Sequence, residues 1–332
     1  MCLVAFALDQ SSRFPFVLAS NRDEFYNRPA ARLGWWSPEN GGASILGGRD
    51  LSEGGTWLGL TARGRLGLVT NVRDPAKMDP KAPSRGHLVT QWLHGDTDMR
   101  GLWPRLAMSG HNGFNMIALD FAQGECFWLN NARLYPERLQ RGVFGLSNAE
   151  LNTPWPKVVA LKAQIKAAMP GASDADDLAN RLFAALADTR LAPDEALPHT
   201  GVPHEWEKAL SPAFIKASEW GYGTRASTVI ITERVKMRVV THVFERSFSS
   251  QSPVALMRRV TLKNWPPRHT MHSEEVARLG ATLAPESTHG DDGFESSEVQ
   301  EQDNHVLLSD THTRKSRARS LIKSSPFALK GE

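Results

Sequence analysis

The fold of this chain is constrained most by a series of short apolar runs that are joined in pairs by tight turns. Residues 2–8 are apolar on both faces, and residues 14–20 repeat that pattern after a polar turn. Such a run is typical of a strand buried between two layers, and two of them in succession predict an antiparallel hairpin. Further runs occupy residues 56–60 and 66–71, 114–120 and 125–130, 143–147, and 228–232 and 237–244.

Two helices are indicated between the later strands. Thr153 is expected to cap a helix with Pro154 in its first position, and Ser173, followed by Asp176, is expected to open a second one. Strands in hairpins with helices grouped between them predict an α+β fold, in which helices pack on mainly antiparallel sheets. The first strand is expected to lie centrally, with Cys2 at its edge.

Composition excludes several classes of protein. The 332 residues are 41% apolar, which is enough for a substantial core. The net charge of +3 comes from nearly balanced acids and bases, so nucleic acid is not an expected partner. No apolar stretch reaches the roughly 18 residues of a membrane span, and a cytoplasmic protein is expected. Only two cysteines occur, and Cys126 lies in a predicted buried strand, so neither a disulfide nor a thiolate metal site is expected.

The chain is expected to divide near residue 250. Residues 1–250 carry the strand and helix patterns and predict one domain. Residues 251–332 are expected to form a variable, largely disordered tail, with one short helix around residues 274–279. A basic cluster at residues 314–319 is either a solvated charge run or a binding site for an acidic partner.

Cys2 is the first candidate for chemistry. Methionine aminopeptidase removes Met1 when the next residue is small, which would leave the Cys2 thiol beside a free α-amine. A thiol with an ordinary pKa of about 8.5 needs a base or a nearby positive charge to act as a nucleophile, and an α-amine with a pKa of about 7.7–8.0 can be that base. No catalytic histidine is then required. His87, His94 and His111 are interpreted as ordinary surface residues.

Other polar residues stand at the ends of predicted strands, where they can converge on a single cleft. They are Asn21, Arg22, Asp23, Asn71, Asn148 and Arg225. A structural interpretation remains open for each motif, because residues 21–24 could form a salt-bridged turn and Arg225 could bind a surface carboxylate. Trp35 and Trp36 stand in a loop rich in proline and glycine, and they either line an apolar ligand site or pack that loop on the body.

Several spaced motifs carry a family resemblance. They are Asn21-Arg22-Asp23-Glu24, Gly47-Gly48-Arg49-Asp50 followed by Gly54-Gly55-Thr56-Trp57-Leu58-Gly59, the strand end Leu68-Val69-Thr70-Asn71, and Tyr222-Gly223-Thr224-Arg225. Up to about residue 248 the chain resembles the NRDE family, also named for transport and Golgi organisation. That family in turn resembles the cysteine-type N-terminal-nucleophile hydrolases, which implies a four-layer αββα sandwich.

The resemblance also implies roles for individual residues. Cys2 matches the nucleophile that attacks an amide carbonyl, and Asp23 the aspartate that orients the α-amine. Asn71 matches an oxyanion donor, Asn148 resembles a second asparagine near the amine, and Arg225 resembles an arginine that stabilises the thiolate. Arg22 stands directly before Asp23, where the hydrolases have an arginine several residues earlier. Alternate strand faces would separate Arg22 from Asp23, and Asp23 is the member tied to Cys2.

Two functions follow from this resemblance. The first is an amidohydrolase or acyltransferase that acts on a small non-peptide amide or acyl substrate and uses neither metal nor organic cofactor. The second is a non-catalytic protein that carries haem or an acyl lipid, because the family is linked to haem trafficking and lipid homeostasis. No Cys-x-x-Cys-His haem motif is present, although Cys2 could itself be a haem ligand. A purely structural scaffold would leave the polar residues without a task.

Overall fold

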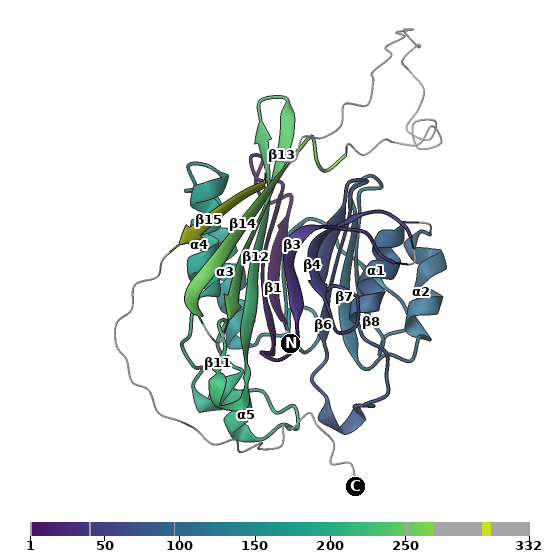
Figure 1. The fold of residues 1–332 in the computed structure, drawn as a ribbon, viewed down its shortest axis with the longest axis vertical. Helices are drawn as coiled ribbons and strands as arrows, with labels where there is room; N and C mark the ends of the chain where they lie inside the picture. The colour runs from purple at the N-terminus through teal and green to yellow at the C-terminus, as the bar shows by residue number, and fades with distance from the viewer. Residues whose placement is uncertain (1, 40, 96, 250–251, 268–300, 307–332) are drawn as a thin grey trace.

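The computed structural model describes residues 2–39, 41–95, 97–249, 252–267 and 301–306, which form two antiparallel sheets packed face to face (Figure 1). The first sheet has the spatial order β10 (Gly142–Leu146), β1 (Cys2–Leu8), β2 (Phe16–Phe25), β12 (Tyr222–Val235), β13 (Arg238–Ser249), β14 (Ser252–Lys263) and β15 (Glu301–Val306), and β11 (Lys216–Ala217) pairs with β12. The second has the order β3 (Ala30–Trp36), β4 (Ile45–Asp50), β5 (Leu58–Thr61), β6 (Arg65–Asn71), β7 (Phe114–Asp120), β8 (Glu125–Asn130) and β9 (Glu137–Arg138).

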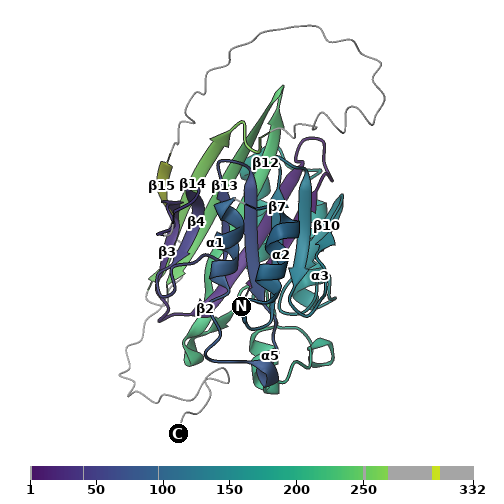
Figure 2. The same cartoon turned by 90° about the vertical axis from the view of Figure 1, so that its right-hand side faces the viewer.

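Helices cover the outer face of each sheet. The first sheet is covered by α3 (Pro156–Ala168) and α4 (Ala175–Leu186), and the second by α1 (Gly86–His94) and α2 (Met99–Ala107) (Figure 1). The view turned by 90° shows α1 and α2 in front of the strands, with α5 (His204–Ala209) at one end of the sandwich (Figure 2). The four-layer αββα arrangement that the resemblance implies is therefore confirmed.

β1 is an interior strand of the first sheet, next to the edge strand β10 and not at the centre as the sequence predicted, and its alternation explains why both of its faces are buried. Leu3 and Ala5 pack against α3 and α4, whereas Val4 and Phe6 belong to the core between the two sheets. A strand with apolar side chains on both faces is stable only when both faces are covered. Residues 2–8 therefore form a strand inside the sandwich, with β10 on one side and β2 on the other.

The predicted hairpins are confirmed, and several boundaries differ. β2 continues through the Asn21-Arg22-Asp23-Glu24 motif to Phe25 instead of closing before it. The third helix begins at Pro156 after Trp155, so Thr153 does not cap it. Asp174, rather than Ser173, caps the fourth helix, because its side chain accepts a hydrogen bond from the Asp177 amide.

Three regions differ more strongly from the sequence expectation. Trp35 and Trp36 lie in strand β3 and not in a loop, and they pack against different cores. The helices α1 and α2 were not predicted. β14 and β15 extend the first sheet beyond residue 250, where the tail was expected to begin. The helix expected around residues 274–279 lies outside the described residues.

Candidate active site

Cys2 lies opposite Arg22 in the antiparallel pairing of β1 with β2. Directly opposed residues of an antiparallel pair project from the same face of the sheet, and here that face is the one that Val4 and Phe6 turn toward the second sheet. Cys2 is a half-buried residue, and the Arg22 side chain is only 5% exposed. A permanent cation and the candidate nucleophile therefore share one face of the first sheet, at the Cys2 end of β1.

The strand is not broken at Arg22, so the four-residue motif divides between the two faces. Arg22 and Glu24 face the second sheet, while Asn21 and Asp23 face the helices. Asn21 is fully buried and its amide donates to the carbonyls of Leu186 and Ala213 at 2.9 and 2.8 Å. Asn21 therefore joins β2 to the end of α4.

Asp23 is a buried carboxylate that is 1% exposed. The Thr224 hydroxyl donates to its Oδ1 at 2.7 Å. Burial raises the pKa of Asp23, while the charge of Lys157 and the Thr224 hydrogen bond act in the opposite direction. Thr224 belongs to the Tyr222-Gly223-Thr224-Arg225 motif, which thus contributes to the site through its threonine.

Lys157 is a buried residue of this end of the molecule that the sequence did not single out. It lies at the start of α3, is 6% exposed, and donates from Nζ to the Leu210 carbonyl at 2.8 Å. Burial lowers the pKa of Lys157 to about 8, and the charges of Asp23 and Cys2 oppose that shift. Lys157 immediately precedes the apolar positions of its helix, so no local pattern marks it as buried.

Charged groups of both signs shift the pKa of Cys2. Burial raises the pKa of Cys2, the charge of Asp23 raises it further, and the charge of Arg22 lowers it. Both members of the Arg22-Asp23 pair therefore act on Cys2, from opposite faces of β2. The sequence argument favoured Asp23 over Arg22, but in the structure Arg22 is the one that shares a face with the thiol.

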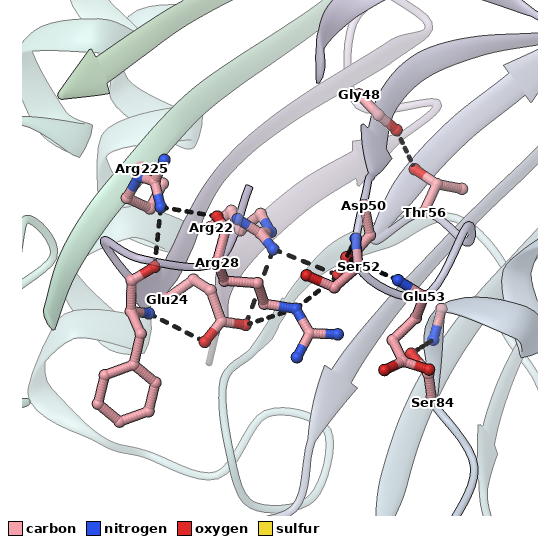
Figure 3. A network of polar contacts seen from close by, with 12 residues as sticks. Arg22, Glu24, Arg28, Gly48, Asp50, Ser52, Glu53, Thr56, Ser84 and Arg225 are labelled. Carbon is pink, nitrogen blue, oxygen red and sulfur yellow. Dashed lines mark hydrogen bonds and ion pairs between the residues drawn. The ribbon is translucent and has the colours of Figure 1, made fainter. Parts of the chain in front are cut away.

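Arg22 belongs to a network of four charged residues shown in Figure 3. Its Nη2 lies 3.7 Å from Glu24 and 3.6 Å from Asp50, and Arg28 binds Asp50 at 2.7 Å. The Nη1 of Arg22 is buried and makes no hydrogen bond to any residue that the structure describes. These contacts hold the guanidinium in place while leaving one of its donors available to an anion.

A tryptophan of the second sheet stacks on the same guanidinium. The Trp57 ring centroid lies 4.3 Å from Cζ of Arg22, which is a cation–π contact. The Trp57 ring also explains why residue 48 is a glycine, because a Cβ on Gly48 would fall 2.2 Å from that ring. Gly48 and Trp57 therefore form one side of the Arg22 site.

Asn148 and Asn71 meet beside Cys2. Asn148 is 1% exposed, and its amide donates to the main-chain oxygen of Asn71 at 2.8 Å. The Ser147 hydroxyl lies 3.1 Å from the Cys2 carbonyl oxygen and 3.2 Å from Oδ1 of Asn148. The side-chain amide of Asn71, which is half-buried at the end of β6, makes no hydrogen bond within the described residues.

Arg225 lies at an irregularity in the pairing of β12 with β2. Its Nη1 donates to the carbonyl oxygens of Phe25, Tyr26 and Arg28 at 2.8, 3.1 and 3.1 Å, and Figure 3 shows Arg225 beside Arg28. The guanidinium thus holds the turn that follows β2. Burial lowers the pKa of Arg225, and the nearby charge of Arg22 lowers it too.

A second buried ion pair supports this end of the molecule. Arg73 and Glu207 are paired with side chains only 2% and 3% exposed, and Glu207 also accepts hydrogen bonds from Thr200. The Arg73 amide donates to the Asn148 carbonyl at 2.8 Å, which connects this pair to the site. Neither residue was singled out from the sequence.

His87 and His111 contact residues other than Cys2, Arg22 and Asp23. His87 contacts the Glu53 carbonyl at 2.6 Å, and His111 contacts the Ser109 hydroxyl at 2.5 Å. Within the described ranges, no group of three or more His, Cys, Asp or Glu residues could hold a metal ion. The same part of the chain contains no helix long and apolar enough to cross a membrane.

Comparison with known proteins decides the family. The family model for Transport and Golgi organisation 2 matches residues 1–250. The chain belongs to the Transport and Golgi organisation 2 family. A human member, the Transport and Golgi organization protein 2 homolog, is 35% identical over 251 residues, which cover 70% of this chain and 89% of the relative. The Drosophila melanogaster member is 26% identical over 256 residues, with coverage of 70% and 88%.

Two solved structures are similar to this chain at much lower sequence identity. The Caenorhabditis elegans ortholog of N-acylethanolamine-hydrolyzing acid amidase gives a TM-score of 0.38 at 10% identity, covering 69% of this family member and 92% of that chain. A mutant conjugated bile acid hydrolase from Clostridium perfringens gives 0.38 at 8% identity, with coverage of 73% and 92%. A TM-score of 0.38 is too low to transfer the activity of either protein to this chain.

Proposed function

We propose that this chain is a cysteine N-terminal-nucleophile enzyme, an amidohydrolase or acyltransferase that acts on a small non-peptide amide or acyl substrate. The observation that carries this proposal is the pairing of Cys2 with Arg22, which sets a buried cation on the same face of the sheet as the side chain of Cys2. A positive charge in that place favours the thiolate form, which is the nucleophile.

The first chemical step is attack by the Cys2 sulfur on the substrate carbonyl carbon. Once Met1 has been removed, the α-amine of Cys2 takes the thiol proton, and Asp23 holds the resulting ammonium group. The carbonyl electron pair moves to oxygen, where the unoccupied amide of Asn71 donates to it. Asn148 holds the end of the Asn71 strand in position through the Asn71 main-chain oxygen.

The second step breaks the bond to the leaving group. The oxyanion collapses, the carbon–nitrogen bond of an amide substrate breaks, and the departing amine takes the proton from the ammonium group. An acyl-cysteine remains. Water, or another amine or alcohol, then attacks the acyl carbon and gives a proton to the α-amine. The carbon–sulfur bond breaks, the sulfur takes that proton, and a carboxylic acid or a new acyl product leaves. In this scheme Lys157, on α3, stabilises the Asp23 carboxylate from the helix side of the sheet. Arg225 positions the turn after β2.

Intact mass and thiol labelling test the first requirement. We expect the purified protein to lack Met1 and iodoacetamide to modify Cys2 much faster than Cys126, because burial raises the pKa of Cys126 well above its ordinary range. Cys126→Ala should keep the fast labelling, and Cys2→Ala should lose it. Retained Met1 would contradict the mechanism, because the α-amine would then belong to a different residue from the thiol.

Asp23→Asn separates the proposed role of Asp23 from a simple charge effect. The negative charge of Asp23 raises the pKa of Cys2, so loss of that charge alone would speed up labelling. If Asp23 holds the α-amine that acts as base, labelling should instead become slower. Faster labelling in Asp23→Asn would remove Asp23 from the mechanism.

Acyl transfer to the protein tests the reaction itself. The full chain should be mixed with a series of acyl 4-nitroanilides of increasing chain length, followed by acid quenching and mass measurement. We expect an acyl adduct on the wild type that is missing in Cys2→Ala. Absence of both adduct and turnover, together with saturable binding of haem or of an acyl lipid, would favour the non-catalytic carrier instead.

A further inference from the structure

The end of the sandwich opposite Cys2 carries a hairpin that extends beyond its neighbours. The last residue pair between β12 and β2 is Thr232 with Phe16, whereas β12 and β13 continue to the pair Val235 with Arg238. Beyond the bond from the Arg234 amide to the Arg13 carbonyl, residues 235–238 make no main-chain hydrogen bond to another element that the structure describes. Figure 1 shows this hairpin projecting past the other strands. We define residues 234–238 as the hairpin tip.

The hairpin tip alternates cations with exposed apolar side chains. Its sequence is Arg234-Val235-Lys236-Met237-Arg238, in which Met237 is 86% exposed and Val235 46% exposed. Lys236 has a φ of 57°, a conformation for which tight hairpin turns usually select Gly, Asn or Asp. Neither the turn geometry nor packing within the fold accounts for a lysine and a methionine at this point.

A basic cavity of about 1440 Å³ lies at the base of the hairpin tip. Five basic side chains line it, and within the described residues none of them forms an ion pair: Arg138, Arg141, Arg234, Lys236 and Arg238. Three acidic residues line it as well, but Asp120 is already paired with Arg65 at 3.0 Å, which leaves Asp9 and Glu125. This end of the molecule therefore carries more basic than acidic side chains, and they surround the exposed apolar side chains of Val235 and Met237.

We propose that the hairpin tip docks this protein onto the surface of a bilayer that contains anionic lipids. Met237 and Val235 would enter the boundary between headgroups and acyl chains, and the flanking cations would contact lipid phosphates. The proposal is independent of the chemistry at Cys2. Because Leu8, at the far end of β1 from Cys2, lines the basic cavity, docking turns the Cys2 end away from the membrane.

The shape of the hairpin tip favours a lipid surface over other partners. A protein interface needs about 20–30 residues on each side, far more than five residues at the end of a narrow ribbon. A nucleic acid would use the cations but leaves no purpose for an 86% exposed methionine between them. A bilayer surface can bind the cations through lipid phosphates and the apolar side chains through its acyl chains.

Vesicle flotation of the full chain tests the proposal. We expect binding to vesicles of phosphatidylcholine with phosphatidylserine and little binding to phosphatidylcholine alone. R234E/K236E/R238E should weaken binding by at least about 100-fold, and Met237→Ser by about tenfold. The matched controls are Met108→Ser, at a methionine that is 87% exposed on another surface, and K81E/R100E/K166E. Both controls should bind like the wild type.

A second variant separates the hairpin tip from the other basic cluster of the chain. Changing Arg314, Lys315, Arg317 and Arg319 to Gln removes that cluster, and vesicle binding should persist. Binding that disappears in this variant but survives in R234E/K236E/R238E would overturn the proposal, as would equal binding to the two kinds of vesicle.

Insertion of the apolar side chain needs its own measurement. Met237→Cys in a Cys2→Ala background can carry an environment-sensitive dye, whose emission should shift to the blue with phosphatidylserine vesicles. The same dye at Met108→Cys should not shift. An unchanged spectrum at position 237 in a bound protein would exclude docking through this side chain.

Discussion

Charged side chains are buried at one end of the sandwich and exposed at the other. At the Cys2 end, Arg22, Asp23 and Lys157 are at most 6% exposed, and the charges act on one another inside the fold. At the hairpin tip the cations are exposed and form no ion pair with described residues. Buried charges cost free energy of folding, whereas exposed ones cost little. The Cys2 end therefore retains charges at the expense of stability, which suits a reactive site, and the hairpin tip suits a contact surface.

The sharpest difference should appear when one buried charge is removed. Glu207→Ala leaves Arg73 buried without its partner, and we expect a loss of about 3–5 kcal/mol in the free energy of unfolding, measured by urea denaturation. The double variant Arg73→Met/Glu207→Leu should recover most of this loss. R234E/K236E/R238E should change stability by only about 0.5 kcal/mol. A loss below about 1 kcal/mol in Glu207→Ala would contradict the contrast between the two ends.

The pH dependence of stability tests the burial of Lys157. Burial lowers its pKa to about 8 from an ordinary value of 10.5, so between these values the unfolded chain holds a proton that the folded chain has released. Stability conferred through Lys157 therefore rises with pH across this window. The difference in unfolding free energy between wild type and Lys157→Met should increase by up to about 3 kcal/mol from pH 8 to 10.5.

The same helix offers a matched control for that experiment. Gln164 is exposed on α3 and carries no titratable group, so the difference between wild type and Gln164→Met should not change with pH. If the difference in unfolding free energy between wild type and Lys157→Met is also independent of pH, then Lys157 is solvated in the folded chain. The Cys2 end would then resemble the hairpin tip more closely than the structure indicates.

A third prediction concerns the cation opposite the thiol. The charge of Arg22 lowers the pKa of Cys2, so Arg22→Gln should move the pH profile of Cys2 alkylation to higher pH and slow the reaction several-fold at neutral pH. Arg22→Lys keeps the charge and should stay closer to the wild type. Profiles that coincide for wild type and Arg22→Gln would remove Arg22 from the site. Alkylation rates measured across the pH range provide the test.

Local patterns predicted the parts of the fold that depend on neighbours in sequence. The hairpins at residues 2–20 and 228–244 follow from alternation and turns, which act over a few residues. β4 was missed because Gly47 and Gly48 lower its strand propensity, although close approach of Leu58 and Trp57 requires glycine there. α2 was missed because Pro104 stands inside it. The four-layer order came from the family resemblance.

The candidate site shows the same limit. The motifs identified Cys2, Arg22 and Asp23, and the strand register then decided which face each one occupies. Lys157 and Glu207 carry no local signal, because each is buried only when its helix packs against the end of the first sheet. Charged residues on helices are usually solvated, so sequence reasoning correctly defaults to a surface position for them. Only tertiary packing reverses that default.

The smallest predicted effect concerns backbone strain at the hairpin tip. Lys236 adopts a φ of 57°, and Asn264 at the same end adopts 56°. Asn tolerates this conformation better than Lys, so Lys236→Asn should stabilise the fold by about 0.5–1 kcal/mol in urea denaturation, and Asn264→Lys should destabilise it by a similar amount. Lys236→Asn should also weaken binding to phosphatidylserine vesicles. A variant that is more stable yet binds less would show that Lys236 is kept for contact, whereas unchanged binding would assign docking to the other cations.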